Sequence, residues 1–315
     1  MSPPAQSEPL LVVVLGPTAS GKTALAVALA QQFSGEIVSC DSIAVYRDFE
    51  IGTAKPSLEQ RSLVPHHLVD IAEPDETFTA GEYSRQARAA IADISRRGKL
   101  PIVVGGTGLY LRALLEGLFP GPQRSGELRL RLRKRAESQG SAHLHRVLSR
   151  LDPAAAAKIH PNDTAKLIRA IEVCLTSRSR MSALWQERGR DPLLGYRILR
   201  LGLNPLRQEL YERINARARQ MFDDGLVEET RALLERFGGH KNVTALDSLG
   251  YRQAKLLLRG ELSREEAIAA AQQGHRNYAK RQVTWFRREP DVHWLVGFGD
   301  DPQIEAEAAE IVFQF

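Results

Sequence analysis

A glycine-rich segment near the amino terminus has the residue types and the spacing of a phosphate-binding loop. One glycine is followed, four residues later, by Gly-Lys-Thr, and the full run is Gly16, Pro17, Thr18, Ala19, Ser20, Gly21, Lys22 and Thr23. In this pattern backbone N–H groups and a helix amino end bind phosphate oxygens, the lysine neutralises the terminal phosphate, and the threonine hydroxyl is a ligand of Mg²⁺. The segment predicts a di- or triphosphate site with Mg²⁺ on Thr23.

Two polar residues that follow other apolar runs are candidates for the reacting centre. Asp41 comes directly after a short run, and Thr107 follows a Gly-Gly pair that ends another. Asp41 could be a general base beside the phosphates, bind water held by magnesium, or cap a helix. Thr107 could donate to a leaving oxygen or cap the next helix. The carboxylate that usually helps to hold magnesium in kinases and hydrolases is missing after Val104.

Two arginines are candidates for a second contact with the diphosphate. Arg213 and Arg217 lie four residues apart in a segment with helical periodicity, so they share one helix face. Their guanidinium groups could bind the diphosphate, because this group matches phosphate oxygens in a bidentate manner. They could equally pair with Glu209 and Glu212 at the surface. Both interpretations stay open from the sequence.

The elements that must position these residues alternate between strands and helices. The predicted strands span 10–15, 36–39, 100–104, 196–203 and 292–296, and the main helices span 23–33, 83–94, 205–237 and 264–286. This alternation favours an α/β fold, a P-loop NTPase-like core with a parallel sheet and its ligand at the carboxyl ends of the strands. Asp41 and the phosphate-binding loop should then meet at one edge of the sheet.

A basic segment with helical periodicity throughout interrupts the α/β pattern. Residues 123–190 contain fifteen Lys and Arg and six Asp and Glu, a net charge of +9, whereas the whole chain carries +5. Helices are predicted over 127–139, 142–150 and 164–175. We therefore predict a first core part over 10–122, an inserted all-helical domain over 123–190 and a second core part over 191–315. The charge favours a nucleic acid partner, with a solvated helical surface as the alternative.

Composition and cysteine content fit a globular protein of a reducing compartment. The chain has 315 residues, of which 43% are hydrophobic and 26% charged. Cys40 and Cys174 are its two cysteines, too few for a disulfide framework or a zinc site with four thiolates. The longest apolar run near the start, 10–15, is too short to span a bilayer. We expect a cytoplasmic protein with no membrane partner.

The motifs taken together, in this order, resemble those of the bacterial tRNA dimethylallyltransferase family over about residues 10–290. The segments that carry the resemblance are the phosphate-binding loop, Asp41-Ser42 with Val45-Tyr46-Arg47, Ile51-Gly52-Thr53-Ala54-Lys55-Pro56, His66-His67-Leu68-Val69-Asp70, Gly105-Gly106-Thr107-Gly108-Leu109-Tyr110, Asn162-Asp163 before Arg169-Ala170-Ile171-Glu172-Val173, Gly250-Tyr251-Arg252, and Ala279-Lys280-Arg281-Gln282-Val283-Thr284-Trp285-Phe286-Arg287.

The resemblance implies transfer of a dimethylallyl group from dimethylallyl diphosphate to N6 of the adenosine 3′ of the anticodon, in tRNAs reading U-initial codons. It implies that Asp41 takes the proton from the amine and that Thr107 supports the reacting centre, with the phosphate-binding loop holding a prenyl diphosphate. It further implies a monomer that binds the tRNA anticodon arm, with the target base extruded from its stack. Arginines of the basic segment, Arg129 and Arg131, complete the expected tRNA contacts, which are otherwise Asp41, Ser42, Ile43, Ala44, Thr107, Ala165, Lys166, Leu167, Ile168, Arg169, Gly250, Tyr251 and Arg252.

Two details qualify this assignment. Lys166 stands where the family usually has arginine, which keeps the charge but loses the planar fork. Tyr278 and Trp285 are seven residues apart on a predicted helix and could form a stacking ladder for RNA, although an aromatic stripe at this spacing favours the protein core.

Two other classes of function are weighed against the transferase. One is a P-loop small-molecule or nucleotide kinase, in which Asp41 would deprotonate a hydroxyl, and the basic insert argues against it. The other is an RNA-binding module with a vestigial nucleotide site. Such a module would keep the basic surface and tolerate the loss of Asp41, so a substitution there separates it from an enzyme.

Overall fold

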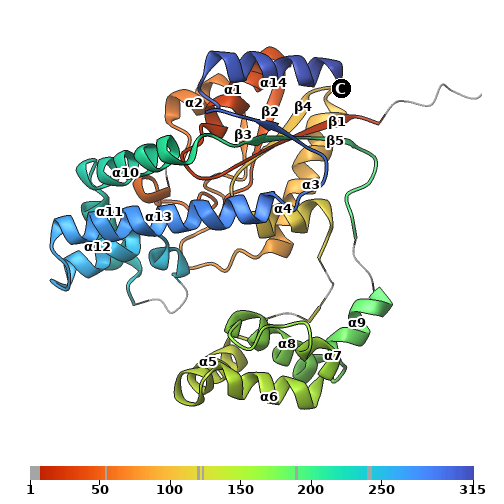
Figure 1. The fold of residues 1–315 in the computed structure, drawn as a ribbon, viewed down its shortest axis with the longest axis vertical. Coiled ribbons are helices and arrows are strands. Elements are labelled where there is room, and N and C mark those ends of the chain that lie inside the picture. Colours follow the sequence, from red (N-terminus) through yellow and green to blue (C-terminus); the bar gives the residue numbers. More distant parts are fainter. Residues whose placement is uncertain (1–7, 54, 119–120, 123, 189–190, 240–242) are drawn as a thin grey trace, which may run out of the picture. The chain divides into compact units, whose positions relative to one another are not determined.

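The computed structural model describes residues 8–53, 55–118, 121–122, 124–188, 191–239 and 243–315 (Figure 1). The chain divides into two compact units, a core unit of Met1–Leu115 with Leu193–Phe315 and an insert of Glu116–Pro192. The predicted insert, 123–190, lies within the second unit, and its end residues 123 and 190 are outside the described residues. Within the core unit, the Leu193 N–H donates to the Leu115 carbonyl at 2.9 Å, so the chain leaves and re-enters this unit at adjacent positions.

The core unit contains one parallel sheet of six strands. Its order is β3-β2-β4-β1-β5-β6, and β1 pairs with β4 and β5 so that Val14 lies opposite Val104 and Leu201. Because all strands run in the same direction, the segments that follow β1, β2 and β4 emerge at the same edge. The strands are β1 (Leu10–Leu15), β2 (Gly35–Ser39), β3 (His66–His67), β4 (Leu100–Val104), β5 (Arg197–Leu203) and β6 (Val292–Leu295).

Helices cover both faces of the sheet, and a group of further helices, α10 to α13, lies to one side of it (Figure 1). The core unit contains α1 (Lys22–Gln32), α2 (Leu58–Leu63), α3 (Ala80–Arg96), α4 (Gly108–Leu115), α10 (Arg207–Asp223), α11 (Leu226–Phe237), α12 (Tyr251–Leu258), α13 (Arg264–Phe286) and α14 (Pro302–Gln314), with 3-10 turns at Ile51–Thr53 and Thr244–Asp247. The insert contains α5 (Gly126–Gln139), α6 (Ser141–Leu151), α7 (Pro153–Ala156), α8 (Thr164–Ser177) and α9 (Met181–Arg188).

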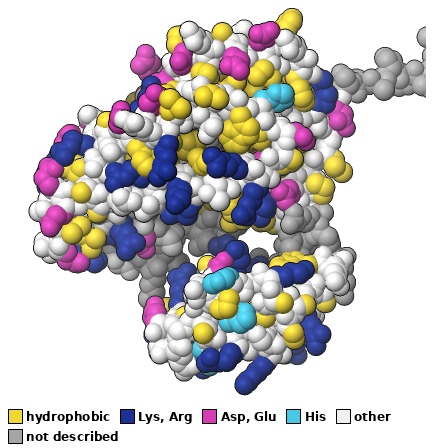
Figure 2. Space-filling view, viewed as in Figure 1, with side chains coloured by type: hydrophobic (Ala, Val, Ile, Leu, Met, Phe, Trp, Pro, Cys, Tyr) yellow, Lys and Arg dark blue, Asp and Glu magenta, His cyan; other side chains and the backbone are white. Residues whose placement is uncertain are grey.

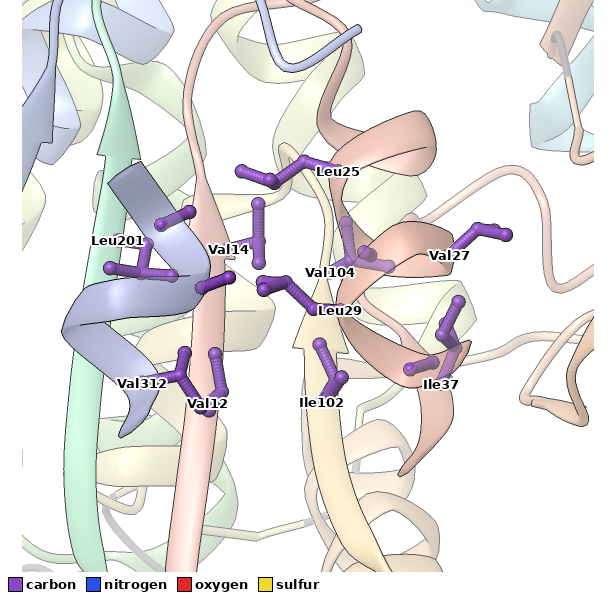
Figure 3. Close-up of a cluster of buried hydrophobic side chains, with 14 of the residues drawn as sticks. Val12, Val14, Leu25, Val27, Leu29, Ile37, Ile102, Val104, Leu201 and Val312 are labelled. Atoms are coloured by element: carbon purple, nitrogen blue, oxygen red, sulfur yellow. The ribbon is translucent and has the colours of Figure 1, made fainter. Parts of the chain in front are cut away.

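The main hydrophobic core packs α1 and α14 against one face of the sheet (Figure 3). The cluster includes Leu25 and Leu29 on α1, Val12 and Leu201 on neighbouring strands, and Val312 on α14, which lies beside Val12. Four of these side chains are at most 2% exposed, and Val312 is 5% exposed. Burial of each such side chain contributes about 1.5–3 kcal/mol, so this cluster fixes the strand ends that carry the site.

Two further clusters hold the helical parts together. In the core unit one cluster joins α11, α12 and the first half of α13, and its members include Phe49, Phe222, Leu226 and Tyr251. In the insert, α5, α6 and α8 enclose a separate apolar cluster. Each helical part therefore has its own core.

The predicted strands agree with the structure to within one residue at each end, with β3 as an addition. The predicted helix over 205–237 divides into α10 and α11 at Gly225, which has φ of 102°, a conformation that favours glycine. No helix is predicted at the positions of α2, α7, α9, α12 and α14, and α4 is expected only as the helix that follows Thr107. In the described part of the chain no helix is long and apolar enough to cross a membrane.

Candidate active site

The P-loop (residues 16–23) follows the central strand β1 and leads into α1. Lys22 Nζ donates to the Pro17 carbonyl at 2.6 Å, and Ser20 Oγ donates to the same carbonyl at 2.8 Å, so the loop closes around its own backbone. Gly21 has φ of 84° and precedes the first turn of α1. A Cβ atom there would lie 2.7 Å from the Gly299 nitrogen, so both backbone conformation and space require glycine. The loop thus has the form that binds phosphate at a helix amino end.

Lys22 lies in an unfavourable electrostatic environment for a cation. Burial and the nearby charge of Arg217 lower the pKa of Lys22 to about 7, and Asp41 opposes this shift. Burial also lowers the pKa of Arg217, whose Nη1 lies 3.5 Å from Thr18 Oγ1. Two cations therefore converge on the loop with Asp41 as a nearby anion. A bound anion with several negative charges would complement this site.

Asp41 follows β2 and is held by the backbone of its own turn. Its Oδ1 accepts hydrogen bonds from the N–H groups of Ile43 at 2.8 Å and Ala44 at 3.2 Å. These residues form a turn and not a helix, so the helix-cap interpretation of Asp41 is wrong. Within the described residues Oδ2 accepts no hydrogen bond from the protein. One carboxylate oxygen is fixed and the other remains able to accept a proton.

Thr107 connects the segment after β4 to the segment after β2. Its Oγ1 accepts a hydrogen bond from the Ser42 N–H at 3.1 Å, and its own N–H donates to the Cys40 carbonyl at 3.2 Å. A Cβ atom on Gly105 would lie 2.1 Å from that carbonyl oxygen, so this contact requires glycine. The Thr107 hydroxyl is thus directed at the Asp41 turn, while the Gly-Gly-Thr turn (residues 105–107) packs directly on the end of β2.

The two arginines of α10 have different partners. Arg217 lies beside the P-loop, as described above. Arg213 instead pairs with Asp300 at 2.7 Å and lies over the Phe298 ring at 3.7 Å. The alternative pairing of Arg213 with Glu209 or Glu212 is therefore not the one formed. Arg217 alone of the two contacts the P-loop, and Arg213 joins α10 to the segment after β6.

Two residues that form hydrogen bonds or ion pairs around the site are not predicted from the sequence. Gln282 on α13 accepts a hydrogen bond from the Thr18 N–H at 2.7 Å and donates to the Gly106 carbonyl at 2.9 Å. Asp300 lies against Gly21 and pairs with Arg213. Only the position of Gln282 within the motif 279–287 could have indicated it, because its partners are distant in sequence. No local pattern indicates Asp300.

The residues expected to bind tRNA in the insert differ in exposure. Arg131, Ala165 and Lys166 are exposed, although Lys166 pairs with Asp163 at 2.5 Å. Leu167 and Ile168 are 0% and 5% exposed and belong to the apolar cluster.

The remaining two arginines share an internal partner. Arg129 binds both carboxylate oxygens of Glu172, at 2.9 and 3.0 Å, and Arg169 binds one of them at 2.7 Å. Glu172 is 0% exposed. Arg129 and Arg169 thus neutralise the negative charge of a buried carboxylate. This is a structural role, in addition to any contact with RNA.

In the core unit the expected tRNA contacts are also divided. Arg252 is exposed, whereas the neighbouring Tyr251 is 0% exposed and its ring packs edge-on against Phe49. The Tyr251 hydroxyl accepts from the Gly52 N–H at 3.2 Å, so this side chain is a packing residue. Figure 2 shows Lys and Arg side chains gathered over the part of the core unit where α13 lies.

The two aromatic residues of α13 are both partly buried. Trp285 is partly buried, with its indole against Gly108 and with Arg112 over its ring at 4.9 Å. Tyr278 is partly buried, and its hydroxyl donates to the Gly106 carbonyl at 3.3 Å. Both side chains therefore lie near the Gly-Gly-Thr turn and its helix.

A parallel sheet with a phosphate-binding loop after its central strand, an aspartate at the same edge and an all-helical insert define a P-loop α/β enzyme. The sequence profile described as IPP transferase matches residues 44–289. The chain belongs to this family, and it is a prenyltransferase. The tRNA dimethylallyltransferase of Koribacter versatilis is 66% identical over 97% of this chain and 99% of its own length, and that of Solibacter usitatus is 55% identical over 97% and 98%.

Solved structures agree in fold. The tRNA isopentenylpyrophosphate transferase of Bacillus halodurans has a TM-score of 0.71 with 37% identity, covering 97% of this chain and 96% of that one. A eukaryotic dimethylallyltransferase, described as acting on tRNA, has a TM-score of 0.78 with 28% identity, covering 97% of this chain and 78% of its own.

Proposed function

We propose that the protein transfers the dimethylallyl group of dimethylallyl diphosphate to N6 of the adenosine 3′ of the anticodon, in tRNAs reading U-initial codons. The observation that carries this proposal is that Asp41 follows β2 at the same sheet edge as the P-loop with its partly buried Lys22 and the neighbouring Arg217. Membership of the IPP transferase family supports the chemistry, and the relatives named above are tRNA dimethylallyltransferases.

The diphosphate end of the donor belongs in the P-loop. Its N–H groups, Lys22 and Arg217 supply positive charge where negative charge accumulates as the carbon–oxygen bond breaks. The fit to Mg²⁺ rests on the Thr23 hydroxyl, which lies in the first turn of α1 and has no hydrogen-bond partner among the described residues. Mg²⁺ held by Thr23 and the diphosphate would neutralise the leaving group. In the described residues no cluster of three His, Cys, Asp or Glu side chains could hold a metal ion alone, which fits a metal carried by the diphosphate.

In this proposal Asp41 takes the proton of the amine. A bond forms between N6 and the allylic carbon, the bond from that carbon to the diphosphate oxygen breaks, and the N6 proton passes to Asp41. Two N–H donors hold Oδ1, so the carboxylate keeps its orientation while Oδ2 receives the proton. Such general-base assistance contributes typically about 10²- to 10⁴-fold in rate. Thr107 supports this centre through its bond to Ser42.

The tRNA side of the reaction uses basic surfaces of both units. Unstacking the target base costs a few kcal/mol, and phosphate contacts can supply this energy. Exposed Arg131, Lys166 and Arg252 are the side chains that we assign to such contacts. The buried side chains of Leu167 and Tyr251 support the neighbouring backbone instead. We propose a monomer that acts on tRNA in the cytoplasm.

The kinase alternative is not favoured. The sheet strand next to β1 ends at Val104 and continues into Gly105, so the usual carboxylate for magnesium is absent from this position. The relatives are transferases of prenyl groups to tRNA by name, not kinases.

The decisive experiment incubates the protein with unmodified tRNA, labelled dimethylallyl diphosphate and Mg²⁺, and analyses the nucleosides. We expect labelled N6-dimethylallyladenosine and diphosphate in equal amounts. Asp41→Asn should reduce the rate at least about 10²-fold while tRNA affinity stays unchanged. Asp223→Asn, at an exposed aspartate that pairs with Arg264, is the matched control. Formation of ADP from ATP without prenylated RNA would refute the proposal, and an unchanged Asp41→Asn rate would remove Asp41 from the mechanism.

A further inference from the structure

The buried side-chain amide of Gln282 connects two loops of the active site, the P-loop and the Gly-Gly-Thr turn. The Gln282 side chain, on α13, is 5% exposed and reaches the P-loop with its Oε1 and the Gly-Gly-Thr turn with its Nε2. The distances are 2.7 Å to the Thr18 nitrogen and 2.9 Å to the Gly106 oxygen. Tyr278, one turn earlier on the same helix, adds its hydroxyl to the Gly106 oxygen. The three chain segments thus meet at one side chain.

The chemistry of the partners explains why this side chain is an amide. The Thr18 N–H can only donate and the Gly106 carbonyl can only accept, so the two ends of the amide have a fixed orientation. A carboxylate would accept from Thr18 but repel the Gly106 oxygen, and a thioether would satisfy neither. A Cβ atom on Gly106 would lie 2.1 Å from the Gln282 Nε2, so a side chain at this position would displace the amide.

We propose that Gln282 is a positioning residue. It fixes the distance between the P-loop, which is the diphosphate cradle, and Asp41, which is the proton acceptor. This inference rests on the proposed function. On one side, Thr18 belongs to the P-loop that holds the diphosphate. On the other, Gly106 precedes Thr107, whose hydroxyl accepts from the residue next to Asp41. Direct bonds therefore run from the cradle through Gln282 to the Asp41 turn.

The sheet alone does not provide this coupling. The ladder between β1 and β4 reaches the Gly105 N–H, which donates to the Val14 carbonyl at 3.4 Å. Beyond this bond both segments turn away into loops, and Gln282 supplies the connection between them. Transfer needs the leaving diphosphate and the proton acceptor at fixed positions around the migrating carbon, and a misplacement of about 1 Å can reduce a rate about 10²-fold. Gln282 should therefore affect transfer more than donor binding.

Three variants test this inference. Gln282→Met preserves the approximate size of the side chain and removes both hydrogen bonds, and Gln282→Glu preserves only the acceptor when its side chain is ionised. Gln272→Met is the matched control, since Gln272 lies on the same helix and its amide donates to the Asn215 carbonyl of α10 at 3.0 Å. For each variant we would measure the thermal midpoint, the affinity for dimethylallyl diphosphate by calorimetry, and the single-turnover transfer rate with saturating tRNA.

We expect Gln282→Met to transfer about 10²-fold more slowly, with donor affinity within about threefold of the original protein. Gln272→Met should transfer at the original rate. A Gln282→Met rate within about threefold of that of Gln272→Met would overturn the inference. A loss of donor affinity as large as the loss of rate would also overturn it, since Gln282 would then be part of the cradle.

The pH dependence of Gln282→Glu provides an independent readout if Gln282→Met does not fold. Burial beside a carbonyl favours the protonated acid, which can donate to Gly106 while its other oxygen accepts from Thr18. The transfer rate of Gln282→Glu relative to the original protein should rise as the pH falls from about 8 to about 6. The ratio cancels any pH dependence that both proteins share, and a ratio independent of pH would contradict the coupling. Failure of the original protein to prenylate tRNA would instead refute the proposed function.

Discussion

Binding of the prenyl diphosphate should take up a proton at Lys22. Burial, followed by the charge of Arg217, lowers the pKa of Lys22 from its ordinary value of 10.5 to about 7. The diphosphate brings negative charge next to the amine, and this favours the ammonium form. The pKa therefore rises on binding, so protons are taken up and affinity should fall as the pH rises above about 7.

The magnitude follows from the two protonation states. At pH 8 about 90% of free molecules would carry a neutral Lys22, and at pH 7 about half. If the bound ammonium has its ordinary pKa, uptake is about 0.9 proton per donor at pH 8 and about 0.5 at pH 7. The donor itself contributes little at pH 8, because the last ionisation of a phosphate group occurs near pH 6.

Calorimetric titration without tRNA measures this uptake directly. The observed binding enthalpy is determined at pH 8 in buffers of different ionisation enthalpy. The slope of the observed enthalpy against the buffer ionisation enthalpy gives the number of protons taken up per donor molecule bound. Lys22→Arg is the informative variant, because guanidinium stays charged and should give a slope near zero. Lys99→Arg, at an exposed lysine of the core unit, is the control.

Two results would refute the reasoning. A slope near zero for the original protein would mean that Lys22 is already an ammonium in the free state. An unchanged slope in Lys22→Arg would assign the proton to another group.

Further expectations concern the insert, the loop contact and the RNA surface. Glu172→Ala should destabilise the insert by about 3 kcal/mol, because Arg129 and Arg169 lose a partner that is fully buried, and unchanged hydrogen exchange in α8 would contradict this. Gly105→Ala should slow transfer about 10²-fold while donor binding persists, because the new Cβ would force Cys40 away; a normal single-turnover rate would count against it. The affinity for tRNA should fall steeply with salt in filter-binding assays because phosphate contacts release counterions, whereas a flat dependence would exclude the basic surfaces as the binding site.

The sequence predicts the parts of the fold that depend on local signals. The aliphatic runs that form β1 and β4 have the predicted bounds, because buried parallel strands consist of consecutive apolar residues. The P-loop could be predicted in the same way, since its glycines and its lysine are contiguous. The edge of the sheet at which Asp41 lies also follows from the order of strands and helices.

The rest depends on contacts between distant residues. β3 has two residues and forms only because it pairs with β2, so no periodicity indicates it. The partner of Arg213, Asp300, is 87 positions away, and the P-loop partner of Gln282 is 264 positions away. Tyr251 shows the converse difficulty, because a tyrosine in a functional motif gives no sign that its ring is buried.

The hydrogen bond between Leu193 and Leu115 makes the insert a natural module for exchange. The two ends of the inserted segment are already joined within the core unit, so a short linker could replace residues 116–192 without stretching the sheet. The same junction could accept a helical domain from a relative with different tRNA preferences. Chimaeras built there would separate what the catalytic scaffold contributes to substrate choice from what its helical domain contributes.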